Sequence, residues 1–500
     1  MKSLRLCAWP CPLSWPCALP LLVVVGMAAG CGAGGSSMSM PGNGMGTIVV
    51  SVSDPPSCKN PNGGFEHVYI TVRSVQAHVD PHATDSSSGW QELAPQLANP
   101  MQIDLFSAAE TNCILAQLGS GSLPAGSYQQ IRLLLVSNAP GASDAVPSNN
   151  ACAGHGYNCV VLNDGSAHEL QLSSQANTGL KIPPGQIVGG PIQVSAGQSV
   201  DVNIDFNACA SIVEEGNGRF RLKPTLSAGQ VSPNNSGIGG QVVDSLSKAP
   251  IVGTVLVAAE MPDSTGIDRI VMETAADSNG NFRFCPLPPG TFDIVIVAIG
   301  PNNLPYNATS VVNVPNGTNL NTIPLVAEAS ASSPAVLMGV VTASTSSGGA
   351  SVDVSLSALQ GISFNSGMPT NRQLTIPLES IPATQTTPAI ASTGLISIST
   401  STACPVGSPA NANCSGYTLV VPGSNPSVAV FSASGFSYAA PAPGSVFFTV
   451  DAIAALPMSG GLPDCSPAEL TTAKDANNQP LQVTASATTD VARIDFAGCS

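Results

Sequence analysis

The densest group of side chains that could perform chemistry is His78-Val-Asp80-Pro-His82, with Asp85 close behind it. Alternate residues of a strand share a face, so both imidazoles and the Asp80 carboxylate would point the same way, which suits zinc. Pro81 favours a different interpretation, because proline cannot donate to a strand ladder and is typical of a strand end. We therefore interpret the segment as a solvated strand end and turn, and we expect no metal site and no cofactor.

Motifs of known catalytic mechanisms are missing from the sequence. The chain has five histidines and contains no G-x-S-x-G elbow, no H-E-x-x-H pair and no phosphate-binding loop of the Walker type. We therefore expect no catalytic residues and predict that the protein is not an enzyme. An extracytoplasmic hydrolase is the least favoured function.

Two aromatic residues are the candidate ligand contacts, because sugar rings bind by stacking on aromatic side chains. Trp90 is the one tryptophan beyond the N-terminal segment, and it follows the loop-like sequence Ser86-Ser87-Ser88-Gly89. Tyr157 lies between Cys152 and Cys159. The alternative for Trp90 is a core residue that anchors a strand. Aromatic residues make up only 4% of the chain, which counts against a strong sugar-binding protein.

The N-terminal segment, residues 1–30, has the pattern of an export signal. Lys2 and Arg5 precede the apolar stretch Leu19 to Gly26, and Ala28-Ala29-Gly30 leads directly into Cys31. Small residues followed by cysteine resemble the lipobox of bacterial lipoproteins, which implies cleavage before Cys31 and lipidation of that residue. An ordinary secretory peptide with an incidental cysteine is the alternative.

Residues 31–45 have the composition of a flexible tether, because they are rich in Gly, Ser and Met and carry no charge. The apolar run before them is short and broken by proline, which does not suit a membrane-spanning helix. We therefore expect the membrane to be a partner through the N-terminal lipid. The expected location is the cell envelope, at the outer membrane or the cell surface.

The amino-acid composition limits both the class of binding partner and the class of fold. Lys and Arg number 15 against 30 Asp and Glu, so the net charge is −15 and the chain lacks the basic surface that nucleic acid requires. A polysaccharide or an envelope protein remains as the partner. The 49 glycines and 43 prolines among frequent runs of Val, Ile and Leu favour an all-β protein with many turns. We expect tandem β-sandwich-like domains.

Ten cysteines follow Cys31, and an even number in an exported protein indicates disulfides. The shortest spacings predict the pairs Cys152–Cys159 and Cys404–Cys414, and Cys465–Cys499 is then the natural third pair. Three pairings are open for the remaining cysteines, which are Cys58, Cys113, Cys209 and Cys285.

The first of three expected β units spans residues 46–230. It opens with an apolar strand, and its second strand, Val68 to Val79, alternates with period two. Its motifs are Thr47 to Val52 before Asp54-Pro55, Trp90-x-x-Leu93, Leu123-Pro-Ala-Gly-Ser-Tyr128 before Ile131-Arg132-Leu133, and Asp205-Phe206 before Leu222-x-Pro224. Their order resembles the DUF4382 family of exported bacterial and archaeal proteins. That resemblance implies no catalytic or binding residue.

The second unit spans residues 236–329. Asn279-Gly280 between alternating apolar residues is a strong hairpin signal. Together with Leu287-Pro288-Pro289-Gly290, it resembles a carboxypeptidase regulatory-like module. The resemblance implies a seven-stranded, transthyretin-like β-sandwich related in fold to starch-binding domains.

The third unit, residues 332–500, repeats patterns of the first. The segment Pro191 to Cys209 aligns with Pro480 to Cys499 after one inserted residue, at Arg493. The Cys152–Cys159 segment likewise has a counterpart at Cys404–Cys414. Two similarities in the same order favour a diverged duplication, and convergent β-strand composition is the alternative.

These features favour a non-catalytic, lipid-anchored envelope protein with a binding, adhesion or structural role. A carbohydrate-binding surface lipoprotein, using the second unit or the Trp90 loop, is the second hypothesis.

Overall fold

The computed structural model describes residues 44–499 with internal gaps. The expected signal peptide, Cys31 and all but the last two residues of the tether therefore lie outside the described residues, and residues 1–42 are a unit separate from 43–500. Among the described residues, no helix is long and apolar enough to cross a membrane. The gaps are 55–63, 82, 85, 95–98, 108–115, 142–143, 173–178, 183–185, 207, 216–217, 223–225, 232–236, 264, 329–330, 351, 363–371, 379–394, 399–403, 440, 442–443 and 456–464.

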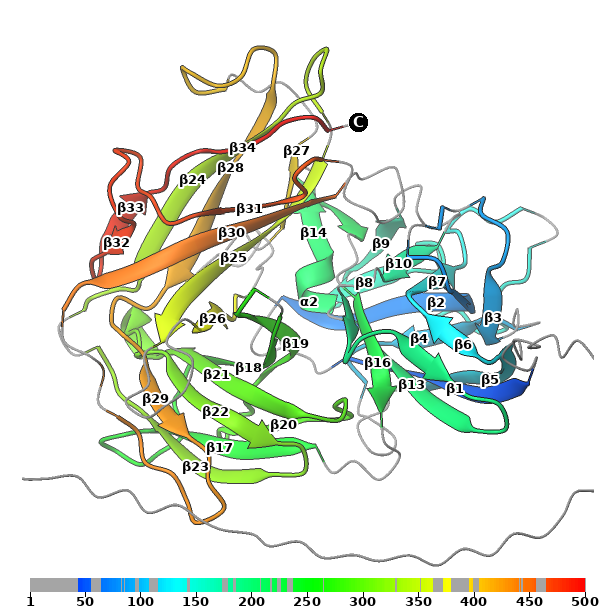
Figure 1. Cartoon of the computed structure of the whole chain (residues 1–500), viewed down its shortest axis with the longest axis horizontal. Coiled ribbons are helices and arrows are strands. Elements are labelled where there is room, and N and C mark those ends of the chain that lie inside the picture. Colours follow the sequence, from blue (N-terminus) through cyan, green and yellow to red (C-terminus); the bar gives the residue numbers. More distant parts are fainter. Residues whose placement is uncertain are drawn as a thin grey trace, which may run out of the picture. The chain divides into compact units, whose positions relative to one another are not determined.

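The described chain is all-β, which confirms the expected fold class (Figure 1). Its helices in the described part are two short turns, α2 (Ala208–Ser211) and η2 (Pro301–Asn303).

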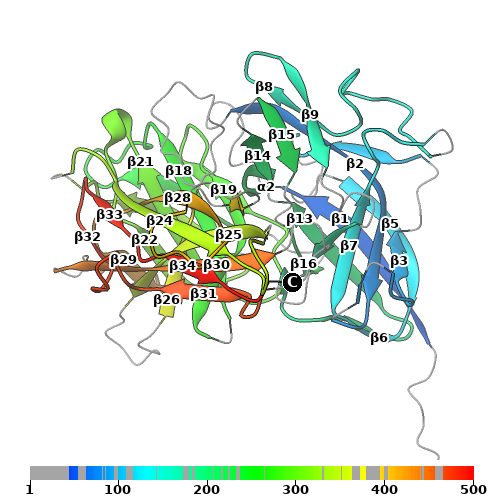
Figure 2. The same cartoon turned by 90° about the horizontal axis from the view of Figure 1, so that it is seen from above.

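The first unit encloses an apolar core between two sheets. The alternating residues Ile48, Val50 and Val52 are fully buried and pack in one cluster with Val68 and Ile70 of the other sheet. The smaller sheet contains, in order, β11 (Ile187–Val188), β16 (Leu226–Val231), β13 (Ser199–Phe206), β1 (Met45–Ser53) and β5 (Ala116–Pro124). In Figure 2, β1 lies between β13 and β5, and the pairing of β1 with β13 is parallel.

The larger sheet of the first unit is organised on β2 (Phe65–His78), a strand of 14 residues that pairs with β3, β4, β7 and β8. Its other strands are β3 (Gln91–Ala94), β4 (Met101–Asp104), β7 (Gln130–Leu135), β8 (Cys159–Leu162), β9 (Ala167–Leu172), β10 (Leu180–Ile182), β14 (Ile212–Glu215) and β15 (Arg219–Leu222). A separate ribbon pairs β6 (Gly126–Tyr128) with β12 (Ile192–Val194).

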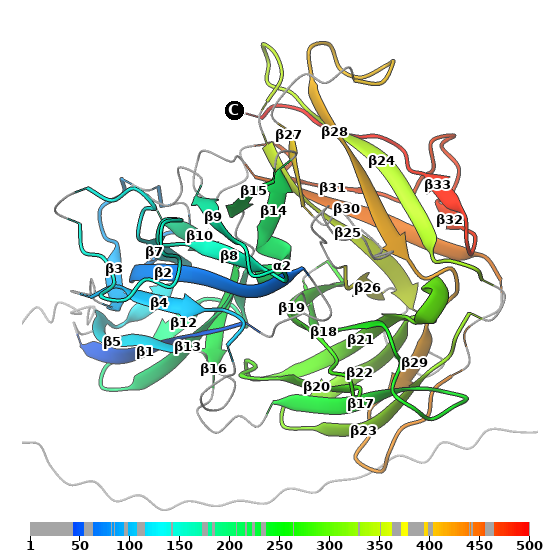
Figure 3. The ribbon, with the colours of Figure 1, turned by 180° about the vertical axis from the view of Figure 1, so that it is seen from behind.

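The second unit has seven described strands in two sheets, as its resemblance implies, and membership of the regulatory-like family stays a prediction. Val242 and Ile323 of the first sheet pack with Val257 and Ile294 of the second in one core. The first sheet is β20 (Asn281–Phe284), β17 (Ile238–Asp244) and β23 (Asn319–Leu325), and the second contains β22 (Thr309–Pro315), β21 (Thr291–Ile299), β18 (Thr254–Pro262) and β19 (Ile267–Ala275). Figure 3 shows both layers from behind.

The expected hairpin at Asn279-Gly280 is wrong, although the turn itself is present. The Gly280 amide donates to the Asp277 carbonyl at 2.8 Å, and Gly280 has a φ of 77°. However, β19 pairs with β18, whereas β20 pairs with β17 in the other sheet. An Asn-Gly pair specifies the backbone angles of a turn and not the partner of the strand that follows. Here the turn carries the chain from one layer to the other.

The third unit continues the second sheet of the second unit. Strand β26 (Arg372–Ile376) pairs in parallel with β19, and β29 (Ser427–Val430) pairs in parallel with β22, so one sheet of eleven strands crosses the boundary expected near residue 330. Its other third-unit strands are β25 (Val352–Ile362), β27 (Leu395–Ile398), β30 (Val446–Ala455), β31 (Glu469–Thr472) and β32 (Gln482–Val483). The expected domain boundaries stay predictions.

A four-stranded sheet covers the third unit's core and relates it to the first unit. It contains β24 (Ala335–Ala343), β28 (Asn413–Val421), β33 (Thr488–Asp490) and β34 (Ile494–Phe496). The opening strand β24 pairs in parallel with β33 and β34, as β1 does with β13. The same hydroxyl-to-carboxylate bond recurs, from Ser53 to Asp205 and from Thr342 to Asp495. These shared pairings support the predicted duplication.

We predict that Gly280→Ala destabilises the fold far more than Gly165→Ala. Both glycines have positive φ, which costs an alanine about 1–2 kcal/mol. An added Cβ at Gly280 would also lie 2.2 Å from the Val242 carbonyl oxygen, whereas at Gly165 nothing lies within 4 Å. Urea unfolding should show a loss at least about 1 kcal/mol larger for Gly280→Ala. Equal losses would contradict the close approach at this turn.

Candidate functional site

Trp90 is half-buried and lies immediately before β3. Its indole Nε1 donates to the Thr84 carbonyl at 3.0 Å, and the Arg132 guanidinium carbon lies 4.1 Å from the ring centroid. The His78 ring lies 5.1 Å away, centroid to centroid. Trp90 is therefore neither a fully buried core residue nor an open platform, because Arg132 occupies one face of its ring.

His78 uses both ring nitrogens within its own loop. Nδ1 accepts from the Asp80 amide at 2.9 Å, so Nε2 carries the proton and donates to the Ser88 carbonyl at 3.0 Å. His82 lies outside the described residues. Within the described part of the chain, no group of three or more His, Cys, Asp or Glu side chains has the geometry to hold a metal ion.

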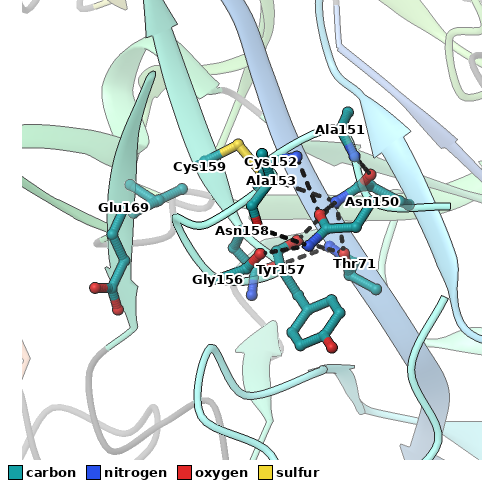
Figure 4. Close-up of a disulfide and its surroundings, with 12 residues drawn as sticks. Thr71, Asn150, Ala151, Cys152, Ala153, Gly156, Tyr157, Asn158, Cys159 and Glu169 are labelled. Carbon is teal, nitrogen blue, oxygen red and sulfur yellow. Dashed lines mark hydrogen bonds between the residues drawn. A yellow bond between two sulfur atoms is a disulfide. The ribbon is translucent and has the colours of Figure 1, made fainter. Parts of the chain in front are cut away.

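Tyr157 lies in a loop closed by the Cys152–Cys159 disulfide (Figure 4). Its carbonyl accepts from Thr71 Oγ1 and from Gln102 Nε2, at 2.5 and 3.0 Å. Figure 4 shows its ring pointing away from this network.

The structure does not bring Tyr157 and Trp90 together. Tyr157 contacts β2 at Thr71, and Trp90 contacts it at His78, seven residues further along. Seven residues of strand span about 23 Å, so the two residues contact β2 at well-separated positions, and the structure gives no contact between them. The prediction that either residue contacts a ligand stays open.

The three disulfides that the spacing predicts are formed. They join Cys152 to Cys159, Cys404 to Cys414 and Cys465 to Cys499. Cys285 is also disulfide-bonded. Cys58, Cys113 and the side chain of Cys209 lie outside the description, so the pairing of these last four cysteines stays open.

Three buried acids and one partly exposed arginine form an acid cluster where β26 joins the second unit: Glu260, Asp268, Asp293 and Arg372. Arg372 Nη2 lies 2.9 Å from Asp268 Oδ1 and 2.6 Å from Asp293 Oδ2, and the Thr375 amide donates to Glu260 Oε2 at 3.1 Å. The three acidic residues are at most 1% exposed. One guanidinium therefore pairs with two of the enclosed acids, and the third, Glu260, has a backbone amide as its partner. Sequence spacing could not indicate this cluster because the three acids come from three different strands.

This excess of acid shifts the titration of the cluster. Burial, followed by the charge of Asp268, raises the pKa of Glu260 well above its usual range. Burial also raises the pKa of Asp268 and, with the charge of Asp268, that of Asp293, while Arg372 opposes both shifts. The cluster therefore binds protons at pH values where carboxyl groups in water are ionised.

A second ion network lies further along the junction. Arg269 of β19 bonds to Asp263 of the same unit and reaches Asp451 on β30 and Glu469 on β31, with the last two distances at 2.5 Å. Opposite charges on β19, β30 and β31 therefore hold strands of the two units together, with the Asp451 carboxylate almost fully enclosed.

A cavity of about 540 Å³ opens beside the acid cluster. It is lined by Gly361 of β25, by Arg372 and Gln373 of β26, and by Phe447 and Thr449 of β30. We call it the Gly361 hollow. None of the three cluster carboxyls lines it, and Arg372 is the residue common to the cluster and the hollow. Sequence reasoning missed the hollow, and the one available signal was a glycine inside a strand.

Two motif acids of the first unit are also buried. Ser53 and Asp205 are register partners on β1 and β13, and the Ser53 hydroxyl donates to Asp205 at 3.0 Å. Burial raises the pKa of Asp205 to about 7, and burial with the charge of Asp205 raises that of Asp54 well above its usual range. These acids lie inside the sandwich and not at an accessible site.

Residues 45–224 match the family model described as domain of unknown function DUF4382, which confirms the resemblance over that part of the chain. A search of curated proteins finds no match.

Solved structures give only remote likenesses. The Bacillus anthracis TIE protein is 8% identical over 91% of this chain and 51% of its own, with a TM-score of 0.15, so this chain spans about half its length. The shaft pilin SpaA of Lactobacillus rhamnosus GG (double mutant) is 9% identical over 57% of this chain and 98% of its own, at 0.16. The minor pilin GBS52 of Streptococcus agalactiae is 9% identical over 52% of this chain and 94% of its own, with a TM-score of 0.16. At such scores these likenesses carry no argument about function.

We predict that the protein is more stable at pH 5 than at pH 8. Burial raises the pKa of Glu273 from 4.5 to about 8 and that of Asp205 from 3.8 to about 7. Between each pair of values the folded state binds the proton and the unfolded chain does not, so the free energy of unfolding falls as pH rises and levels off above about 8. Urea titrations should show a loss of about 2 kcal/mol or more between pH 5 and pH 8.

The matched control for this pH dependence is Glu273→Gln, which cannot ionise and should flatten part of the profile. Groups with lowered pKa, such as Asp495, lose their contribution only at more acidic pH and do not mask the effect. A free energy of unfolding that stays constant or rises from pH 5 to pH 8 would contradict the raised pKa values of the buried acids.

We also predict that Arg372→Gln destabilises the protein by about 3 kcal/mol or more at pH 7, because the enclosed acids lose their cation. Arg493→Gln, which breaks a partly exposed pair with Asp495, should cost less than about 1 kcal/mol. Urea unfolding of both variants measures the difference. Similar small losses would show that Arg372 does not hold the junction.

Proposed function

We propose that this protein is a lipid-anchored, non-catalytic component of the bacterial cell envelope with a binding, adhesion or structural role. The observation that carries the proposal is the eleven-stranded sheet that runs through the second and third units. Such a sheet, fixed by ion pairs across the junction, suits a stiff body that presents a surface at a distance from its anchor.

The disulfides support an extracytoplasmic location. Disulfides persist in oxidising compartments and are rare in the cytosol. Two of the pairs close loops of only 7 and 10 residues in sequence separation, which pins the segments that enter β8 and β28. The export-signal pattern of residues 1–30 leads to the same compartment.

The lipid anchor rests on the sequence Ala28-Ala29-Gly30-Cys31 and on the uncharged tether behind it. One acylated cysteine would fix the chain to the membrane, and the tether would separate the anchor from the first described strand, β1.

The placement of the ionisable groups supports a non-catalytic role. The enclosed acids of the cluster do not line the Gly361 hollow, and His78 has both ring nitrogens engaged in its own loop. A general acid or base must reach the proton that it transfers, and these groups face protein atoms.

We expect metabolic labelling with an alkyne analogue of palmitate, in a bacterial host that processes lipoproteins, to label the wild-type chain and not Cys31→Ser. Cys17→Ser is the matched control, because that cysteine lies inside the predicted signal peptide and its loss should leave the label unchanged. The labelled chain should partition into the detergent phase. An unlabelled wild-type chain released into the medium would overturn the anchor and favour an ordinary secretory peptide.

A carbohydrate-binding role is the second candidate function. The Gly361 hollow favours it, because it combines an exposed aromatic ring with polar side chains. On this proposal the sugar site would lie in the third unit, and not at the Trp90 loop or in the second unit's own sandwich.

A further inference from the structure

The Gly361 hollow exists because one strand position has no side chain. Among the described residues, no atom lies within 4 Å of a Cβ added at Gly361, so they leave the space above this backbone open. Glycine inside a strand weakens it, and such positions recur where a ligand approaches the backbone closely. The backbone angles of Gly361 are not in the left-handed region, so the fold itself does not require glycine here.

The neighbours of Gly361 form a row across three strands. Gly361 pairs with Gln373 on β26, and the pair Gln360–Phe448 places Gly361 next to Phe447 on β30. Adjacent strands lie about 4.8 Å apart, so Gln373 and Phe447 stand about 10 Å apart on either side of the glycine. Phe447 is 49% exposed, whereas the next residue, Phe448, is buried. An aromatic side chain and an amide therefore flank a flat, open floor.

The polar side chains of the hollow are held by bonds to the protein, and these bonds do not use all of their hydrogen-bonding capacity. Gln373 Nε2 makes only a long, 3.4 Å bond to Thr449 Oγ1, which a ligand hydroxyl could replace. Arg372 bonds to the acid cluster through Nε and Nη2, and no bond among the described residues uses its Nη1. A guanidinium has five N–H donors, so the acid cluster leaves those of Nη1 unused.

The charges of the acid cluster, next to the hollow, disfavour the binding of anions there. Arg372 is the one cation of the acid cluster and is surrounded by Glu260, Asp268 and Asp293, so the group has no net positive charge while even one carboxyl is ionised. The lining residues themselves include no acid that would attract a cation. A neutral ligand with hydroxyl groups and an apolar C–H face fits an aromatic ring flanked by amide and guanidinium donors.

We propose that the Gly361 hollow binds a sugar ring of a neutral polysaccharide, with Phe447 as the stacking side chain and Gln373 and Arg372 as hydrogen-bond donors. The inference rests on the proposed binding role in the envelope and names its ligand class. The volume of about 540 Å³ falls within the range of small-ligand pockets, roughly 300–1,000 Å³.

The test is calorimetric titration of the full-length protein, in a sugar-free detergent, with maltohexaose, cellohexaose and xylohexaose as neutral probes and trigalacturonate as an acidic probe. We expect at least one neutral probe to bind with a dissociation constant below about 1 mM. Saturation-transfer NMR should show contact with the C–H protons of that sugar. Phe447→Ala should weaken binding by about tenfold.

The decisive variant is Gly361→Leu, whose Cβ has room at this position and whose larger side chain occupies the hollow, so it should abolish binding without lowering the thermal transition. Gly416→Leu is its matched control, because Gly416 is also exposed in a strand, β28, and the nearest atom to its added Cβ lies 3.8 Å away. The control should bind as the wild type does.

Three results would overturn the proposal: no binding of any neutral probe, a preference for trigalacturonate, or binding that survives Gly361→Leu. Binding that is lost in Trp90→Ala and kept in Gly361→Leu would move the sugar site to the first unit. None of these results bears on palmitate labelling of Cys31, so failure of the hollow and failure of the anchor are separate outcomes.

Discussion

The junction of the second and third units depends on the contact between Arg372 and the buried carboxyls of Asp268 and Asp293. Strand β26 reaches β19 through only two register pairs, so backbone bonding holds this strand weakly. The guanidinium, the Thr375 amide on Glu260 and the Thr375 hydroxyl on the Asp268 carbonyl add to it, beside the β22–β29 pairing and the Arg269 network. Because one cation lies among three acids, the strength of this contact depends on how many protons the acids hold.

The same arginine connects the core to the Gly361 hollow, so the buried acids and the surface site are parts of one arrangement. The acids fix the guanidinium at the cavity wall, and fixed donors lose less entropy when a ligand binds. They also cancel its charge, which turns a basic side chain into a directional donor for neutral groups. A more acidic medium adds protons to the buried acids and, because their pKa values are raised in the fold, stabilises the folded state.

Local sequence patterns predicted local structure well. The other features depend on which distant strands pair with each other. An apolar run identified β1, alternation identified β2, and short spacing identified the Cys152–Cys159 and Cys404–Cys414 disulfides, because all three signals depend on neighbouring residues. The Asn279-Gly280 turn was found but its strand partners were not. The acid cluster and the Gly361 hollow come from strands that lie far apart in the chain, such as β18, β26 and β30, so no spacing along the sequence could show them.

One inserted residue, Arg493, explains a difference between the first and third units. Strand β13 runs unbroken into Ile204-Asp205-Phe206, whereas its counterpart is split before Ile494-Asp495-Phe496, where Arg493 is inserted. Burial raises the pKa of Asp205, which has a serine as its partner. Burial alone would also raise that of Asp495, but hydrogen bonds from Arg493 and Thr342 lower it. If the units arose by duplication, the insertion that breaks the strand is also the one that neutralises its acid, so the two copies differ in their response to pH at an equivalent position.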